Sequence, residues 1–170
     1  MKDQVKNLSF SLERSMRYHS KRRAFFNFWE RFTNFISIVL SSGAIYAFSQ
    51  NHPKFAITSS LVLTIFSALT LVIGFSEKAR EHLEFELSFA NLKKRLLLSD
   101  KSQKLIDEIR AEINMLDAKE SEPLTVLEQI CYNEQVIADG LSDDLLTPIT
   151  WYQRLFAQYF SICPEKMFKK

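Results

Sequence analysis

The sequence predicts an all-α protein whose central part is a helical transmembrane hairpin with two crossings. Between Phe32 and Ser76 the only charged residue is Lys54, and a polar break over 50–54 separates two apolar arms, 32–49 and 55–76. At about 1.5 Å per residue, helices over these arms are about 27 Å and about 33 Å long. A bilayer hydrocarbon core is about 30 Å thick. Each arm can therefore cross once, and the short break between them requires an antiparallel pair.

The rest of the chain also has helical patterns, and three parts are expected: a basic amphipathic N-terminal helix over 1–31, the hairpin over 32–76 and a cytoplasmic helical bundle over 77–170. Residues 1–31 contain no Gly or Pro, which favours a helix leading into the first arm. Apolar periodicity and the placement of Pro and Gly predict the later helices. They are the continuation of the second arm to Leu98, 102–118, 124–138 and 151–160.

The charge distribution predicts the orientation. Residues 1–31 hold eight Lys/Arg against three Asp/Glu, whereas residues 105–150 hold two against eleven. Basic residues flank both outer ends of the hairpin and the turn has a single Lys. Positive charge stays on the cytoplasmic side, so a multi-pass protein of the bacterial inner membrane with both termini in the cytoplasm is expected.

The same basic residues are candidates for contact with lipid headgroups or with a phosphate-bearing signal, and orientation charge alone also explains them. They are Arg17, Lys21, Arg22, Arg23, Arg31, Lys78 and Arg80.

Small and hydroxyl-bearing residues form a stripe on each arm. Helical spacing places Asn34, Ser37 and Ser41 on one face of the first arm, and Ser60, Thr64 and Ser67, continued by Gly74, on one face of the second. Two interpretations remain open at this stage. The stripes pack the two helices closely, or they line a wet pore in an oligomer.

Residues typical of catalysis or metal binding do not occur in recognisable spacing. His19, His52 and His82 are far apart, Cys131 and Cys163 are isolated, and the three glycines form no phosphate-binding loop. The sequence therefore predicts no catalytic residues, no metal, no cofactor and no nucleic-acid partner, and it favours a protein that is not an enzyme.

Several short motifs resemble the SLATT domain, a two-transmembrane effector domain associated with bacterial nucleotide-signalling anti-phage systems. The basic and aromatic segments 15–19 and 22–26 are similar to the start of that domain. The segment 71–92, with Gly74, Ala79, His82 and Phe85, resembles its junction after the second crossing. The segments 131–134 and 151–155 are similar to its late cytoplasmic helices.

The resemblance implies a membrane effector that oligomerises and forms a pore or disrupts the inner membrane during abortive infection. It also implies a separate sensor, or an enzyme that makes a nucleotide messenger, as the partner that triggers it. Three other classes remain: a non-conducting membrane scaffold, a holin-like or superinfection-exclusion prophage protein, and a soluble bundle that uses both arms as buried core.

Overall fold

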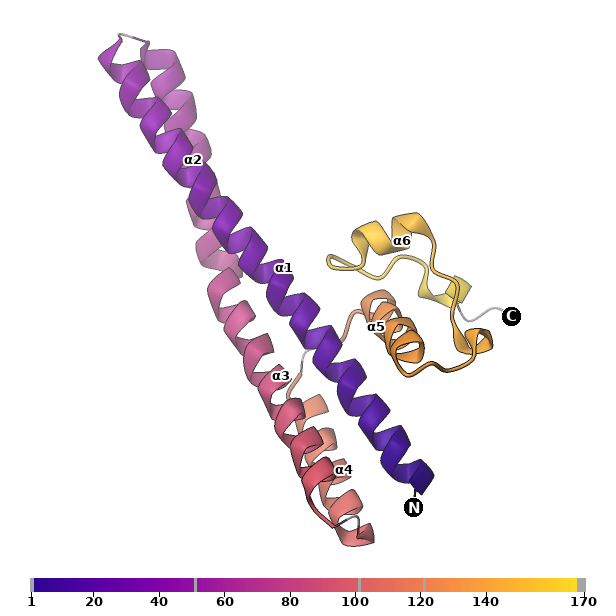
Figure 1. Cartoon of the computed structure of the whole chain (residues 1–170). Coiled ribbons are helices and arrows are strands. Elements are labelled where there is room, and N and C mark those ends of the chain that lie inside the picture. Colours follow the sequence, from indigo (N-terminus) through magenta and orange to yellow (C-terminus); the bar gives the residue numbers. More distant parts are fainter. Residues whose placement is uncertain (1, 51, 101, 121, 168–170) are drawn as a thin grey trace. The chain divides into compact units, whose positions relative to one another are not determined.

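The computed structural model describes residues 2–50, 52–100, 102–120 and 122–167, and within these ranges the chain forms helices and turns but no β-strand. The all-α fold class expected from the sequence is confirmed. Figure 1 shows the helices, which are α1 (Lys2–Ser49), α2 (Pro53–Ile73), α3 (Phe75–Leu98), α4 (Gln103–Asp117), α5 (Thr125–Ala138) and α6 (Trp151–Phe156). Short 3₁₀ turns cover Asp143–Leu145 and Pro164–Met167.

The helix α1 runs without a break through the basic segment and the first apolar arm. After the turn, Pro53 occupies the first position of α2, where its missing N–H costs no intrahelical hydrogen bond. The second arm and its extension were expected as one helix to Leu98. Gly74 interrupts that helix for one residue, in a left-handed conformation with φ +63°. Its N–H still bonds to the Thr70 carbonyl at 3.0 Å, so the interruption is a sharp turn between α2 and α3.

The later helices begin and end close to the expected residues, with one exception. Ser102 caps α4, because its Oγ accepts a hydrogen bond from the Leu105 N–H at 3.2 Å. The helix α6 ends at Phe156, four residues before the expected end. This early end goes with contacts to residues beyond the helix. The Gln153 amide donates to the carbonyls of Ile162 and Cys163, which holds the following segment against α6.

One stretch has the length and composition of a membrane span among the residues searched. It runs from Pro53 to Leu98 through the Gly74 turn, and its most apolar window has a mean hydropathy of 2.2. Only 11% of that window is buried. The core helix of a soluble protein is mostly buried, so the exposure of this window is weak evidence for a membrane span. The structure thus has one candidate span among the residues searched, and the second of the two predicted crossings stays a prediction.

The chain folds as two compact units. The hairpin unit is Arg23–Glu81, and the core unit combines Met1–Arg22 with His82–Lys170. The hairpin was expected over 32–76. The hairpin unit begins nine residues before that range and ends five residues after it. Both α1 and α3 contribute residues to both units.

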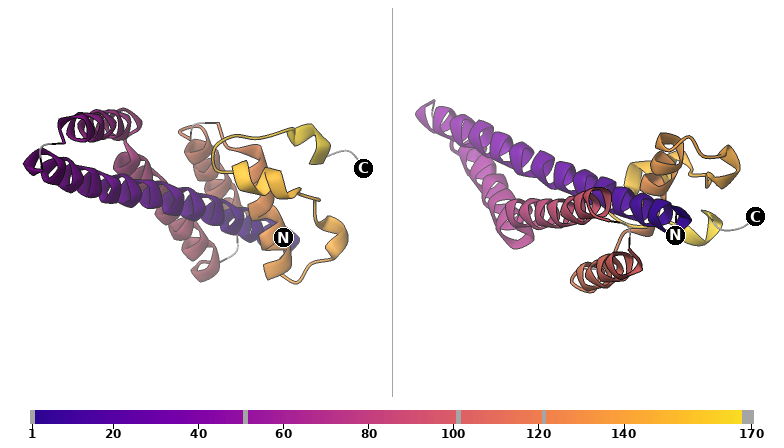
Figure 2. Two further views of the ribbon diagram at one scale, coloured as in Figure 1. Left: turned by 90° about the horizontal axis from the view of Figure 1, so that it is seen from above. Right: turned by 60° about the horizontal axis from the view of Figure 1, so that its bottom comes forward.

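Within the hairpin unit, α2 lies alongside the C-terminal part of α1 in both views of Figure 2. The buried residues described along α2 and the apolar arm of α1 are small: Thr33 and Ala47 on α1 and Ser59 on α2. At the open end of the hairpin, Phe26, Phe75 and Ala79 form a buried cluster together with Phe25 and Trp29. Aromatic side chains therefore close the end where α1 meets the start of α3.

The core unit has two apolar clusters. One joins α1, α3 and α4 through Leu8, Leu12, Phe89, Leu92, Leu96, Ile106 and Ile109. The other joins α1, α5 and the end of α6 through Tyr18, Val126, Leu127, Cys131 and Ala157. Arg95 of α3 adds an ion pair with Glu112 of α4 at 2.6 Å. The core unit thus buries residues from both ends of the chain.

Replacing Gly74 by Ala is expected to destabilise the hairpin unit by about 1–2 kcal/mol, the usual cost of a left-handed L-residue. A Cβ at this position would also lie 3.3 Å from the Glu77 Oε2. Thermal unfolding of the purified protein in detergent, followed by circular dichroism, measures the change.

The matched control is Gly43→Ala. Gly43 lies inside α1, and its added Cβ would meet the Phe55 ring at an ordinary 3.9 Å. This variant should be neutral or stabilised by up to about 1 kcal/mol, because Ala is the better helix former. Equal destabilisation of the two variants would contradict a special role for the Gly74 turn.

Candidate functional site

The structure separates the seven small and hydroxyl-bearing residues predicted to pack or to line a pore. On α1, Ser37 and Ser41 are half-buried, whereas Asn34 is exposed. On α2, Ser60, Thr64 and Ser67 are all exposed. Gly74, the seventh, is half-buried at the turn before α3. The two stripes therefore do not face each other within one chain.

The buried small residues of the hairpin are ones that the sequence stripes did not include. Thr33 and Ala47 of α1 and Ser59 of α2 are buried. A signal for them exists in the sequence, because positions 33, 37, 40, 44 and 47 alternate by four and three residues and follow one helix face. On α1, Ser37 belongs both to the predicted stripe and to this face. On α2, the residues of the predicted stripe are exposed, and the buried residue is Ser59.

Three hydroxyl groups of these stripes donate to carbonyls of their own helices. Ser41 donates to the Ser37 carbonyl at 2.7 Å, Ser60 to the Ala56 carbonyl and Thr64 to the Ser60 carbonyl, both at 2.8 Å. A hydroxyl without a partner is costly in hydrocarbon. These internal bonds let Ser60 and Thr64 of the exposed α2 stripe face an apolar surrounding without that cost.

The predicted headgroup-contact residues divide into two groups. Three of them bind within the core unit: Arg17 donates to the Gln135 amide oxygen at 2.7 Å, Lys21 pairs with Glu134 at 2.9 Å, and Arg22 donates to the Gln158 carbonyl at 2.6 Å. In the hairpin unit, Lys78 pairs with Glu81 at 3.2 Å and Arg23 is half-buried. The side chains of Arg31 and Arg80 are exposed.

Two histidines far apart in the sequence meet in the core unit. His19 of α1 and His82 of α3 are buried, and their Nδ1 atoms lie 3.0 Å apart. The other ring nitrogen of His19 lies 3.6 Å from the Glu120 Oε2. Phe85 and Phe89 stack on the His19 ring with centroid distances of 4.9 and 5.4 Å. The pair is thus held by α1 and α3, with a carboxylate from the bend after α4.

Spacing along the sequence did not predict this cluster, but a signal is visible in the helical register. On α3, position 82 continues the buried series 85, 89, 92 and 96, and on α1 position 19 continues the series 8, 12 and 16. A histidine at a core position of two helices that pack together predicts that the two rings approach each other. The spacing rules for metal ligands apply along one segment and cannot detect such a pair.

The environment keeps the His19 ring neutral. Burial, with a further contribution from His82, lowers the pKa of His19 to about 3, although the Glu120 carboxylate lies close to its second nitrogen. The neighbouring Tyr18 hydroxyl is buried and accepts a hydrogen bond from the Leu124 N–H at 3.0 Å. Burial raises the pKa of Tyr18. A pair of neutral imidazoles can share a hydrogen bond or bind a metal ion.

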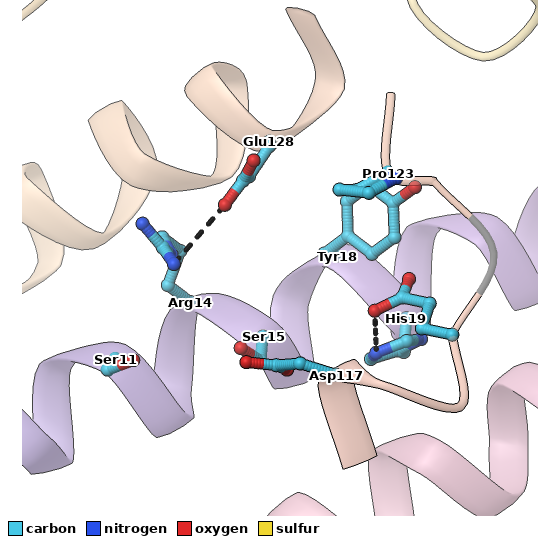
Figure 3. A pocket seen from close by; sticks show the side chains of 9 residues that line it. Ser11, Arg14, Ser15, Tyr18, His19, Asp117, Pro123 and Glu128 are labelled. Carbon is cyan, nitrogen blue, oxygen red and sulfur yellow. Dashed lines mark ion pairs between the residues drawn. The ribbon is translucent and has the colours of Figure 1, made fainter. Parts of the chain in front are cut away.

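A pocket of about 210 Å³ lies beside His19. Figure 3 shows its lining, which comes from α1, from the end of α4 and from the start of α5: Ser11, Arg14, Ser15, Tyr18, His19, Asp117, Glu120, Pro123 and Glu128. Three carboxylates face one guanidinium, and that guanidinium pairs with Glu128 at 3.2 Å. The lining favours a cation over an anionic nucleotide.

The cysteine thiols do not add a nucleophile to this region. Cys131 is buried, and burial raises the pKa of its thiol to about 12. A protonated thiol is a poor nucleophile. Cys163 is exposed and lies outside the pocket lining.

Comparison with known proteins adds no assignment. No family model, curated protein or solved structure matches this chain. The resemblance to the SLATT domain therefore rests on the motifs described above.

The neutral His19 ring predicts acid sensitivity. In the unfolded chain His19 binds a proton below its ordinary pKa of 6.5, whereas in the folded protein it does so only near pH 3. The unfolded state therefore gains protons first, and the free energy of unfolding falls as pH drops from 6.5 towards 3, by an amount on the order of a few kcal/mol. Chemical denaturation at a series of pH values, with a chelator present, measures this slope.

The variant His19→Gln removes the titrating group and should flatten the slope in this pH window. His52→Gln, in the exposed turn, is the control and should keep the slope of the unmodified protein. A slope that is the same in all three proteins would contradict a buried neutral His19.

Proposed function

We propose that this protein is a membrane effector that oligomerises in the bacterial inner membrane and forms a pore or disrupts the bilayer. The observation that carries the proposal is the uncovered apolar surface of the hairpin unit. Large apolar side chains on both of its helices are exposed, among them Phe35, Ile38, Ile45, Phe48, Ile57, Leu61, Leu71 and Val72. Monomeric soluble proteins rarely expose contiguous apolar patches of this kind.

The contact inside the hairpin supports lipid as its solvent. Helices in hydrocarbon associate through small residues that allow close approach rather than through apolar burial. In α2 and in the apolar arm of α1, the buried residues described are the small Thr33, Ala47 and Ser59, whereas many bulky apolar side chains of the same helices are exposed. In our proposal both arms cross the bilayer, and the aromatic cluster of Phe25, Phe26, Trp29 and Phe75 lies at the cytoplasmic interface.

The exposed hydroxyl stripe of α2 supports assembly. Ser60, Thr64 and Ser67 lie outside the contact with α1, so they remain accessible to a second copy of the chain. When several hairpins gather with this stripe inward, the hydroxyls face one another and can line a wet path. The stripe on α1 is already partly used in packing the hairpin.

The biological setting follows from the resemblance to the SLATT domain. We propose an anti-phage role in which a separate sensor, or an enzyme making a nucleotide messenger, triggers the effector. The acidic lining of the pocket beside His19 does not suit an anionic messenger. A contact with a partner protein is therefore the form of triggering that our proposal favours.

Ion flux through liposomes tests the pore. The triple variant with Ser60, Thr64 and Ser67 each replaced by Leu should lose most of its flux, because an apolar constriction excludes water and ions. The control is Thr58→Leu, which removes an exposed hydroxyl from another side of the same helix and should conduct like the unmodified protein. Cross-linking in the same vesicles reports assembly.

Unchanged flux in the triple variant would remove the lining role from this stripe. Assembled protein that conducts no ions would instead identify a non-conducting scaffold, and the pore would be rejected.

Protease protection tests the topology. In intact spheroplasts an external protease should leave epitope tags at both termini intact, because both lie in the cytoplasm in our proposal. Lysed spheroplasts, in which both tags should be digested, are the control. Digestion of one tag in intact cells would show a single crossing, and recovery of the protein in the supernatant after ultracentrifugation would show no membrane insertion.

A further inference from the structure

Three potential ligand groups from separate segments converge in the core unit. His19 belongs to α1, His82 to α3 and Glu120 to the bend after α4, and one ligand atom from each lies within 4.8 Å of the others. The two histidines are buried and the Glu120 side chain is 14% exposed. We infer that these residues form a binding site for a divalent transition-metal ion, with Zn²⁺ as the best match.

The distance between the imidazoles fits two ligands of one ion. Their Nδ1 atoms are 3.0 Å apart. Two nitrogens at about 2.0–2.1 Å from a tetrahedral Zn²⁺ are separated by about 3.4 Å. A small opening of the pair therefore admits the ion in place of the shared proton. The Glu120 Oε2 lies 3.6 Å from the Nε2 atom of His19, so its side chain must turn to reach an ion held between the two Nδ1 atoms. Glu120 lies on a bend outside the helices, and one ligand atom of each of the three residues already lies within 4.8 Å of the others.

The donor set selects the class of metal. Imidazole nitrogens suit Zn²⁺ and its transition-metal neighbours, whereas Mg²⁺ and Ca²⁺ prefer sites made of oxygen ligands. Three protein ligands leave the fourth tetrahedral position of Zn²⁺ to water. Burial lowers the pKa of His19, so this ring is neutral and ready to bind at physiological pH.

The surroundings support the site in two ways. The pocket lined by His19 and Glu120 also carries Asp117 and the ion pair of Arg14 with Glu128. Three carboxylates against one guanidinium leave an excess of negative charge that attracts a cation. The rings of Phe85 and Phe89 stack on His19 and fix its plane, which preorganises the ligand. A bound ion would join α1, α3 and the bend after α4.

The inference does not depend on pore formation. It can be tested on the full-length protein, purified in detergent and stripped of metal with a chelator. Titration with Co²⁺ should produce the visible d–d absorption of tetrahedral coordination and saturate at one ion per chain. Calorimetric titration with Zn²⁺ should show the same stoichiometry, and Mg²⁺ should give no binding.

Three variants and two controls identify the ligands. His19→Gln, His82→Gln and Glu120→Gln should each weaken Zn²⁺ binding by about 100-fold or more. His52→Gln removes a histidine outside the cluster, and Cys131→Ser with Cys163→Ser removes both thiols. These controls should bind as the unmodified protein does. Glu120→Gln changes a partly exposed side chain on a bend, so it is the variant least prone to misfold.

Two results would overturn the inference. The first is an unmodified protein that gives neither d–d absorption with Co²⁺ nor heat with Zn²⁺, a result that needs no variant. The second is unchanged Zn²⁺ affinity both in Glu120→Gln and in a histidine variant that is folded. A helical circular dichroism spectrum like that of the unmodified protein shows that such a variant is folded.

Discussion

The uncovered apolar surface of the hairpin unit is the constraint on which the other features depend. The buried residues described in α2 and in the apolar arm of α1 are the small Thr33, Ala47 and Ser59, whereas many bulky apolar residues of the same helices are exposed. Exposure of apolar area to water costs about 25 cal/mol per Å², and the core unit uses its own apolar residues in its own two clusters. Buried small residues and hydroxyls bonded to carbonyls of the same helix are typical of helices in lipid, and they agree with the membrane location that we propose.

Opposite charges join the basic N-terminal segment to the acidic later half within one chain. Arg14 pairs with Glu128 and Lys21 with Glu134, so α1 and α5 match each other along the core unit. Such exposed pairs contribute about 0–1 kcal/mol each. They align α5 on α1, while the cluster around Tyr18 and Cys131 provides the apolar burial.

The helices were predictable because their signals are local: a Ser cap at 102, a Gly after Ala138 and helical apolar periods between them. The turn at Gly74 was not, because a single glycine in an apolar run is compatible with a straight helix. The early end of α6 depends on Gln153 binding carbonyls about ten residues later. The stripe of Ser60, Thr64 and Ser67 was visible as a periodic face of the helix. Periodicity does not show whether such a face packs on α1, meets another chain or faces the solvent. The His19–His82 pair joins residues 63 positions apart, and only the packing of α1 on α3 reveals it.

The core unit is discontinuous in sequence, because the hairpin unit is inserted between Arg22 and His82. This arrangement sets an order for biogenesis. The ribosome delivers Leu8, Leu12 and Tyr18 first, yet their partners on α3, α4 and α5 emerge only after the entire insertion. During that interval the N-terminal segment is synthesised without the residues that bury it. Completion of the core therefore comes last, so a chain truncated before α5 would leave Tyr18 without its cluster.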